Sequence, residues 1–250
     1  MKWPGAIDWR AWIISALAAA GLMLGFRLLV AAVPAAVDHD PILLVYVGTD
    51  GTAKDAAEMD SHTAAFAAAL ESATRHHVVR VPIQTRTPED RARAVRTFVA
   101  RCSAERPPVV VAWSRAAWVV ETAAIDGASI RAIVSVGGIH DLGGPMHSRV
   151  AANLIGREVA TSPLHRNCSR MPPLLLIHSP RDRYVPPSQS VALCNHLRAG
   201  GRVVRLVCPS ECGHVPWSAA EGKFYSLLIC DWLSSVRASK PDPSDDALLL

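Results

Sequence analysis

Short apolar runs alternate with alanine-rich or amphipathic stretches along most of this chain, and this alternation constrains the fold more than any other feature. The runs are apolar at nearly every position, which is typical of strands buried on both faces of a parallel sheet. Expected strands are 42–47, 78–83, 108–113, 130–136, 174–178 and 203–207. Expected helices are 56–75, 88–101, 114–125, 191–198 and 219–236. The pattern predicts an α/β fold, with a mostly parallel sheet of about six strands between two layers of helices.

Length and composition favour one sizeable domain. The chain has 250 residues, of which 50% are hydrophobic and 19% are charged, and this is enough to bury a core. We expect the domain at residues 38–237, followed by a flexible tail at 238–250 that contains two prolines and three acids. The net charge is only +4, and no cluster of basic residues alternates with aromatics. Nucleic acid is therefore not an expected partner.

Residues 1–37 form a segment that is apolar almost throughout. Residues 11–26 carry no charge, and the apolar run resumes after Arg27, so the total is long enough to cross a bilayer. Lys2 and Arg10 precede the run, which favours a cytoplasmic N-terminus and an extracytoplasmic domain. We expect a membrane anchor. A cleaved signal peptide, which would leave the domain secreted or periplasmic, and a packed or lid-like helix are the alternatives.

The six cysteines are scattered along the chain, which favours buried apolar positions over a disulfide framework. In an exported domain, a disulfide between Cys208 and Cys212 would stiffen the loop before His214. A metal site built from these three residues lacks a fourth ligand nearby in the sequence. We therefore expect neither a metal nor a cofactor.

Two polar residues follow strands in the second half of the chain. Asp182 lies on a polar loop just after strand 174–178, and His214 lies on the loop after strand 203–207. Because the carboxyl ends of parallel strands meet at one edge of a sheet, the acid and the histidine are expected to lie together, where α/β enzymes keep their sites. An acid that holds an imidazole is half of a catalytic triad.

The segment from Met171 to His214 contains LLLIHSPRDRYVPPSQS and a later Gly-His. It resembles the C-terminal part of the α/β-hydrolase superfamily, especially the small esterase-like and prolyl-oligopeptidase-related branches, with Ser179 where that pattern has glycine. GGIHDL and Ser-Pro-Leu-His, further upstream, resemble segments of feruloyl-esterase-like and kynurenine-formamidase-like hydrolases. The resemblance extends over roughly residues 42–236. It implies a minimal six-stranded α/β-hydrolase fold, since too little chain remains for two further antiparallel strands.

The resemblance also implies a nucleophile between a strand and a helix, and VVVAWSRAAW places Ser114 there. The family pattern is Gly-x-Ser-x-Gly, because the strained turn accepts only small residues. Ala112 and Ala116 occupy the glycine positions, and alanine is the smallest residue with a Cβ. The predicted triad is Ser114, Asp182 and His214. The alternative for the serine is a helix N-cap.

An oxyanion hole would use backbone N–H groups. One is expected from Arg115, which follows the nucleophile. The other is expected from Thr49 or Asp50, in a loop that reads Gly48-Thr49-Asp50-Gly51 where similar esterases have His-Gly-Gly-Gly. A carboxylate at Asp50 that faced inward would oppose catalysis. The alternative is an Asp-Gly turn with the acid in solvent.

Two tryptophans flank the predicted triad in the sequence. Trp113 precedes the nucleophile and Trp217 follows His214, so both are predicted to border the substrate pocket. Packing in the core is the alternative, because large aromatics at a seam between helix and sheet are usually buried.

We interpret the other polar residues in the second half of the chain as non-catalytic. Asp141 lies one strand too early to be the triad acid. His140 and His165 are expected to be loop histidines or pocket lining, and His178 a hydrogen-bonded core residue.

These features predict a serine hydrolase that cleaves carboxylic esters of small molecules through an acyl-enzyme at Ser114. An amide-directed enzyme, either an arylformamidase or a serine peptidase, is the first alternative, because those branches share the segment between acid and histidine. A non-catalytic, membrane-tethered binding protein of the same fold is the second. Its basis is the departure from the family pattern at Ala112, Ala116, Ser179 and residues 48–51.

Overall fold

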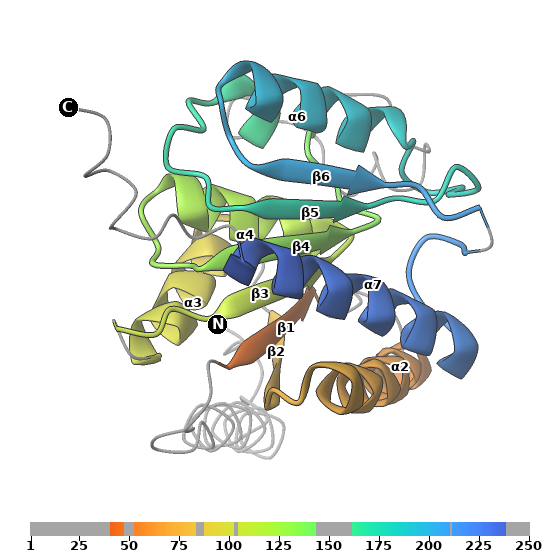
Figure 1. Cartoon of the computed structure of the whole chain (residues 1–250). Coiled ribbons are helices and arrows are strands. Elements are labelled where there is room, and N and C mark those ends of the chain that lie inside the picture. The colour runs from red at the N-terminus through yellow and green to blue at the C-terminus, as the bar shows by residue number, and fades with distance from the viewer. Residues whose placement is uncertain are drawn as a thin grey trace, which may run out of the picture. The chain divides into compact units, whose positions relative to one another are not determined.

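A computed structural model of the chain describes residues 41–47, 53–83, 88–102, 105–143, 162–210 and 212–238. These residues contain a six-stranded sheet in the order β2-β1-β3-β4-β5-β6, in which all neighbours are parallel (Figure 1). The strands are β1 (Ile42–Val47), β2 (Val78–Ile83), β3 (Val109–Trp113), β4 (Ala132–Val136), β5 (Leu174–Ile177) and β6 (Val204–Val207). The helices are α2 (Ala53–Thr74), α3 (Pro88–Arg101), α4 (Arg115–Ile125), α6 (Ser188–Ala199), α7 (Ala219–Ala238) and a short 3-10 turn, η2 (Pro163–His165). The predicted parallel sheet of six strands is confirmed.

The order of the strands reverses next to β1. The chain runs outward from β1 to β2, crosses back to β3 on the other side of β1, and then adds β4, β5 and β6 in one direction. In open sheets of this kind, the crevice at the carboxyl ends of the strands on either side of the reversal is where ligands bind. The carboxyl end of β3, followed by Ser114, lies at this position.

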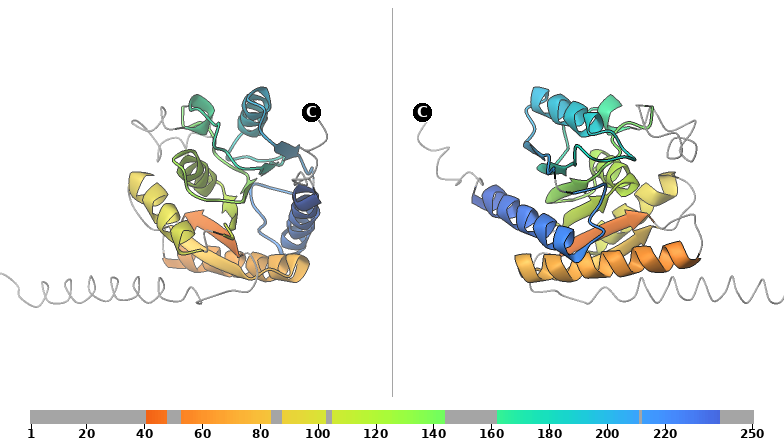
Figure 2. Two further views of the ribbon diagram at one scale, coloured as in Figure 1. Left: turned by 60° about the vertical axis from the view of Figure 1, so that its left-hand side comes forward. Right: turned by 90° about the vertical axis from the view of Figure 1, so that its right-hand side faces the viewer.

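Helices cover both faces of the sheet. Helices α3, α4 and α6 pack on one face, and α2 and α7 pack on the other (Figure 2). Along β3, Val110 and Ala112 belong to the core of the first face, whereas Val109, Val111 and Trp113 belong to that of the second. All five residues of β3 are buried. This burial on both sides explains why the strands are continuously apolar.

Three helix starts differ from the expected ranges. Helix α2 begins at Ala53, three residues early. Helix α6 begins at Ser188, three residues before the stretch with helical spacing and directly after the two prolines that permit a helix start, and Pro187 has helical dihedrals. Helix α4 begins at Arg115, so Ser114 lies outside the helix. Helix α4 is buried on nearly all sides, although it contains one acid, Glu121. A charged residue in a helix of this kind requires a partner.

The predicted anchor and the predicted tail lie outside the described residues, except for Ala238, which is the last residue of α7. The chain divides into the units Met1–Asp38 and His39–Leu250, and only the second contains described residues. Within the described ranges, no helix is both long and apolar enough to cross a bilayer.

All six cysteines lie in the described part of the chain, and all are free thiols. The disulfide considered between Cys208 and Cys212 is therefore not formed. Cys212 is buried in the core, as are Cys168 and Cys194, which fits their interpretation as apolar residues.

Candidate active site

Ser114 adopts a backbone conformation that L-residues rarely populate. Its φ is 50° and its ψ is −120°, at the turn between β3 and α4. Its N–H donates to the carbonyl of Val136, and its own carbonyl accepts from Ala117 and Ile139, so both neighbouring segments hold the turn. Its side chain makes no capping hydrogen bond to α4. Ser114 therefore occupies the N-cap position of α4 without capping the helix through its side chain, and the strain at this turn requires another reason.

Ser114, His214 and Asp182 are linked by hydrogen bonds. Nε2 of His214 lies 2.9 Å from Oγ of Ser114, and Nδ1 of His214 lies 2.6 Å from Oδ2 of Asp182. The carboxylate can only accept, so Nδ1 of the histidine carries the proton and Nε2 is free to accept from the serine hydroxyl. The three side chains come from the loops after β3, β5 and β6, which meet at one edge of the sheet. The sequence prediction named these three residues, and the structure brings them together.

The carboxylate of Asp182 has four polar partners. Oδ2 accepts from His214 and lies 3.1 Å from Nε2 of His178, while Oδ1 accepts from the N–H groups of Tyr184 and Val185, at 2.8 and 2.9 Å. Burial alone would raise the pKa of Asp182, but the hydrogen bonds from His178, His214 and Val185 lower it far below its usual value. Asp182 therefore stays charged and holds the imidazole of His214.

Gly137, at the end of β4, lies against the loop that carries His214. Its φ is +55°, and a Cβ at this position would meet the backbone and the ring of His214. Gly138 next to it is equally restricted, because a Cβ there would meet Ser135 and His140. Gly137 therefore lets the histidine loop approach the sheet closely, and Gly138 leaves room for Ser135 and His140.

Ser179, which replaces the glycine of the family pattern, tethers the same loop. Its hydroxyl donates to the carbonyl of Cys212, two residues before His214, and accepts from the N–H of Arg181, at 3.0 Å. One buried side chain therefore connects the acid loop to the histidine loop. The departure from the family pattern has a structural function here.

One of the predicted oxyanion donors lies within the described residues. Arg115 is the first residue of α4, so its N–H belongs to the positive end of a helix directly beside Ser114. Thr49 and Asp50, the predicted second donors, lie outside the described residues.

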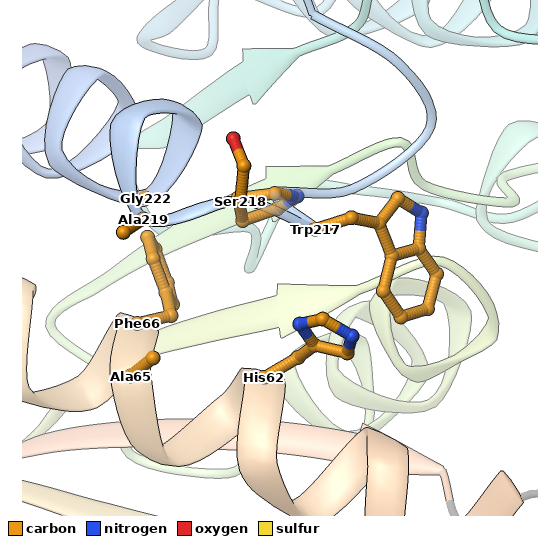
Figure 3. Close-up of a pocket in the computed structure, with 8 residues that line it drawn as sticks. His62, Ala65, Phe66, Trp217, Ser218, Ala219 and Gly222 are labelled. Atoms are coloured by element: carbon orange, nitrogen blue, oxygen red, sulfur yellow. The ribbon is translucent and has the colours of Figure 1, made fainter.

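The two tryptophans occupy different environments. Trp113 is buried beside Phe66, with ring centroids 5.1 Å apart, so it packs in the core and does not line an open pocket. Trp217 is 40% exposed and packs edge to face with His62, at 5.0 Å. Together with Ser218 and other residues at the start of α7, these rings line a small cavity between α2 and α7 (Figure 3). Its volume of about 30 Å³ has room for water rather than an organic substrate.

Beside the imidazole, Tyr184 is the exposed aromatic. Its ring centroid lies 5.3 Å from that of His214, and the side chain is 54% exposed. It was not singled out in the sequence, because only the folding of the acid loop brings it next to the histidine.

Three polar residues have roles that the sequence did not reveal or revealed only in part. His178 is a hydrogen-bonded core residue, as expected, but it also lies 3.1 Å from the carboxylate of Asp182. His140 lies in the loop after β4, as expected, but it is completely buried and pairs with Glu121 of α4 at 2.9 Å. Asp141 has a structural role, accepting from the N–H of Gly143 and lying 3.1 Å from His165. Within the described ranges, no group of His, Cys, Asp and Glu is arranged to hold a metal ion.

A further residue, Glu221, was detectable from a local sequence signal. Its carboxylate accepts from the N–H groups of Trp217 and Ser218, while the Ser218 hydroxyl accepts from the Glu221 N–H. Ser-x-x-Glu before an apolar helix is a capping box. The same carboxylate accepts from the N–H of Gly213, so the start of α7 also holds the residue before His214.

No protein-family model and no curated protein matches this sequence. Solved structures do match its fold. An esterase/lipase from an uncultured bacterium has a TM-score of 0.62 at 15% identity, over 82% of this chain and 80% of the other. A truncated carbohydrate esterase from gut microbiota has a TM-score of 0.62 at 18% identity, over 80% and 87%. The esterase domain of a Rhodothermus marinus protein has a TM-score of 0.54 at 18% identity, over 80% and 89%. At these identities the likeness establishes a shared fold.

Proposed function

We propose that this chain, which has the α/β-hydrolase fold, is a serine hydrolase that cleaves carboxylic esters through an acyl-enzyme on Ser114. The observation that carries the proposal is the pair of hydrogen bonds that joins the serine to His214 and His214 to Asp182, at 2.9 and 2.6 Å. Esterases and lipases among the proteins of the same fold support the choice of an ester substrate.

In the first half of the reaction, Oγ of Ser114 attacks the ester carbonyl carbon as its proton passes to Nε2 of His214. The imidazolium is stabilised by the charged carboxylate of Asp182. The N–H of Arg115 would donate to the oxyanion of the tetrahedral intermediate. This intermediate collapses to the acyl-enzyme as the alkoxide leaves and takes the proton from His214.

In the second half, His214 accepts a proton from water as the water oxygen attacks the acyl carbon. The second tetrahedral intermediate releases the carboxylic acid, and Ser114 regains its proton from Nε2 of His214. The protons balance over the cycle, and the chemistry proposed here runs on side chains and backbone N–H groups of this chain.

The backbone of Ser114 favours catalysis over a purely structural role. A non-catalytic binding protein gains nothing from a serine in a conformation that costs about 1–3 kcal/mol. An esterase gains an exposed nucleophile at the crevice of the sheet, since the sharp turn presents Oγ above the strand ends.

The direct test is labelling of the purified full chain with a fluorophosphonate probe, which reacts only with an activated serine. We expect labelling that Ser114→Ala and His214→Ala abolish. Ser234→Ala is the matched control, because this exposed serine lies on α7 and its hydroxyl contacts only its own helix. A folded chain that does not label would contradict the proposal. Rates with nitrophenyl esters of increasing acyl length, aryl formamides and peptides then separate an esterase from the amide-directed alternatives.

We also propose that residues 1–37 hold the enzyme at a membrane, with the catalytic domain on the extracytoplasmic side. The support is the apolar sequence and the basic residues that precede it. Fractionation of cells that produce the full chain, beside a chain that lacks these residues, tests this. Equal amounts of both chains in the soluble fraction would contradict it.

A further inference from the structure

Five side chains form a line of close polar contacts from the middle of α4 to the acid of the candidate triad. Glu121 Oε2 lies 2.9 Å from Nδ1 of His140, whose Nε2 lies 3.0 Å from Oγ of Ser190. The same Oγ lies 2.6 Å from Nδ1 of His178, and Nε2 of His178 lies 3.1 Å from Oδ2 of Asp182. The five residues come from α4, the segment after β4, α6, the end of β5 and the loop after β5.

The line is shielded from water. The side chains of Glu121, His140, His178 and Asp182 are all 0% exposed, and Ser190 is 1% exposed. Burying a polar group without a hydrogen-bond partner costs free energy. A buried line of five polar side chains is therefore stable only if nearly every polar atom in it has a partner. Gln189, which precedes Ser190 in α6, accepts from the backbone N–H of His140 at 2.9 Å and holds that histidine in place.

The directions of the hydrogen bonds follow from the end at Asp182. Nε2 of His178 faces two acceptors, the Asp182 carboxylate and the carbonyl of Val185 at 2.9 Å, so it must carry a proton. If His178 is neutral, its Nδ1 accepts, and the hydroxyl of Ser190 donates to it. Ser190 must then accept from Nε2 of His140. The line therefore donates in one direction, toward Asp182.

The reverse direction requires the same number of protons but more buried charge. It needs His178 as an imidazolium and Glu121 as a carboxylate. Oε1 of Glu121 is buried and has no hydrogen-bond partner among the described residues, so a charge there would be poorly solvated. Burial raises the pKa of Glu121, opposed by the charge of His140 and the hydrogen bond from it, and this also favours a proton on the Glu121 and His140 pair.

We propose that Glu121, His140 and Ser190 are positioning residues for the triad. Through them, His178 is held as the neutral Nε2–H tautomer. This tautomer keeps the Asp182 carboxylate in the orientation in which it can hold His214. The proposal rests on the proposed function for its catalytic consequence. Its structural content, the tautomer of His178, does not depend on any activity. Glu121 belongs to the helix that begins beside Ser114, so the line connects the nucleophile's helix to the triad acid.

The first test is made on the full chain labelled with ¹⁵N in histidine. Two-bond ¹H–¹⁵N spectra distinguish an Nε2–H histidine, an Nδ1–H histidine and an imidazolium, and the variant His178→Gln assigns the signal. We expect a neutral Nε2–H histidine near pH 7. A His178 imidazolium, or an Nδ1–H tautomer, would overturn the proposal, whether or not the chain hydrolyses esters.

The second test compares two substitutions of similar volume. In Glu121→Gln, the amide can still donate to Nδ1 of His140, so the direction of the line is kept. In Glu121→Leu, this donor is lost. We expect kcat for a nitrophenyl ester to fall about ten- to a hundredfold in Glu121→Leu with KM little changed, because the loss is one of geometry at the reacting groups. Glu121→Gln should restore most of kcat.

The spectra and the rates separate the two proposals. Equal kcat values for folded Glu121→Leu and for the wild type would overturn the positioning role. A chain that has the expected His178 tautomer but does not react with a fluorophosphonate would instead overturn the proposed function. Ser190→Ala, which removes the middle of the line, is expected to lower kcat as Glu121→Leu does and to change the His178 signal.

Discussion

Gly137 and His214 are in such close contact that position 137 has no room for a side chain. A Cβ there would lie 2.2 Å from the carbonyl oxygen of His214 and 3.0 Å from its Nδ1. The backbone cannot withdraw, because the N–H of Gly137 donates to the carbonyl of Ile177 at 2.9 Å and continues the sheet. The general base of the proposed reaction is therefore packed directly onto the end of β4.

Gly137→Ala should displace His214 and lower kcat/KM by about a hundredfold, since a shift of about 1 Å at a catalytic group has that effect. Initial rates with a nitrophenyl ester measure it. Gly201→Ala is the control: its φ of +69° is also positive, but a Cβ there meets nothing within 4 Å. It should lose about 1–2 kcal/mol of stability from the φ alone and keep its activity. Equal activity of the two variants would rule out the clash.

At position 114, we expect the glycine variant to be more stable than the alanine variant, which is the reverse of the usual order. The φ of 50° at this position strains any residue with a Cβ, so Ser114→Gly should be more stable than Ser114→Ala by about 1 kcal/mol. Both variants lack the hydroxyl, so the difference isolates the backbone. At the exposed helical position Ser234, alanine should instead be more stable than glycine by about 1 kcal/mol. Free energies of unfolding in urea measure all four variants, and the same order at both positions would show that the turn is relaxed.

The sequence predicted the sheet because strands buried on two faces are apolar at every position. The carboxyl ends of parallel strands meet at one edge, which was enough to place Asp182 beside His214, whereas Ser114 was named from the resemblance to the α/β-hydrolase pattern. The small residues Ala112 and Ala116 were enough to suggest the turn. Both are completely buried.

The supporting contacts could not be predicted, because they depend on how side chains from separate helices pack. Glu121 and His140 are 19 residues apart, and nothing in their spacing indicates a pair. Ser179 was noted as a departure from a pattern, but its bond to Cys212 appears only when the acid and histidine loops are adjacent. Glu221 is the exception, since its capping box is a local signal.

Ser179→Gly restores the residue of the family pattern and should nevertheless impair the proposed activity. Without the hydroxyl, the carbonyl of Cys212 loses its donor and the loop that carries His214 is less well held. We expect kcat to fall by about tenfold, in line with a small misplacement of the base. Ser188→Gly, an exposed substitution at the start of α6, is the control and should leave kcat unchanged. Wild-type kcat in Ser179→Gly would mean that the tether is dispensable.

Asp182 should make stability depend on pH in a defined direction. Its pKa in the folded chain is lowered, so it stabilises the fold fully above its unfolded pKa, about 3.9, and this contribution is lost as the pH falls toward the folded pKa. The difference in free energy of unfolding between the wild type and Asp182→Asn should therefore be constant from pH 7 to about pH 4 and shrink below that. Asp231→Asn is the control. This acid is 70% exposed and lies 3.2 Å from Arg205, and a surface pair of this kind should give a difference near zero throughout. Denaturation in urea between pH 3 and pH 7 measures the two differences in free energy of unfolding. A difference for Asp182→Asn that stays constant below pH 4 would contradict the charged, fully hydrogen-bonded carboxylate on which the proposed mechanism depends.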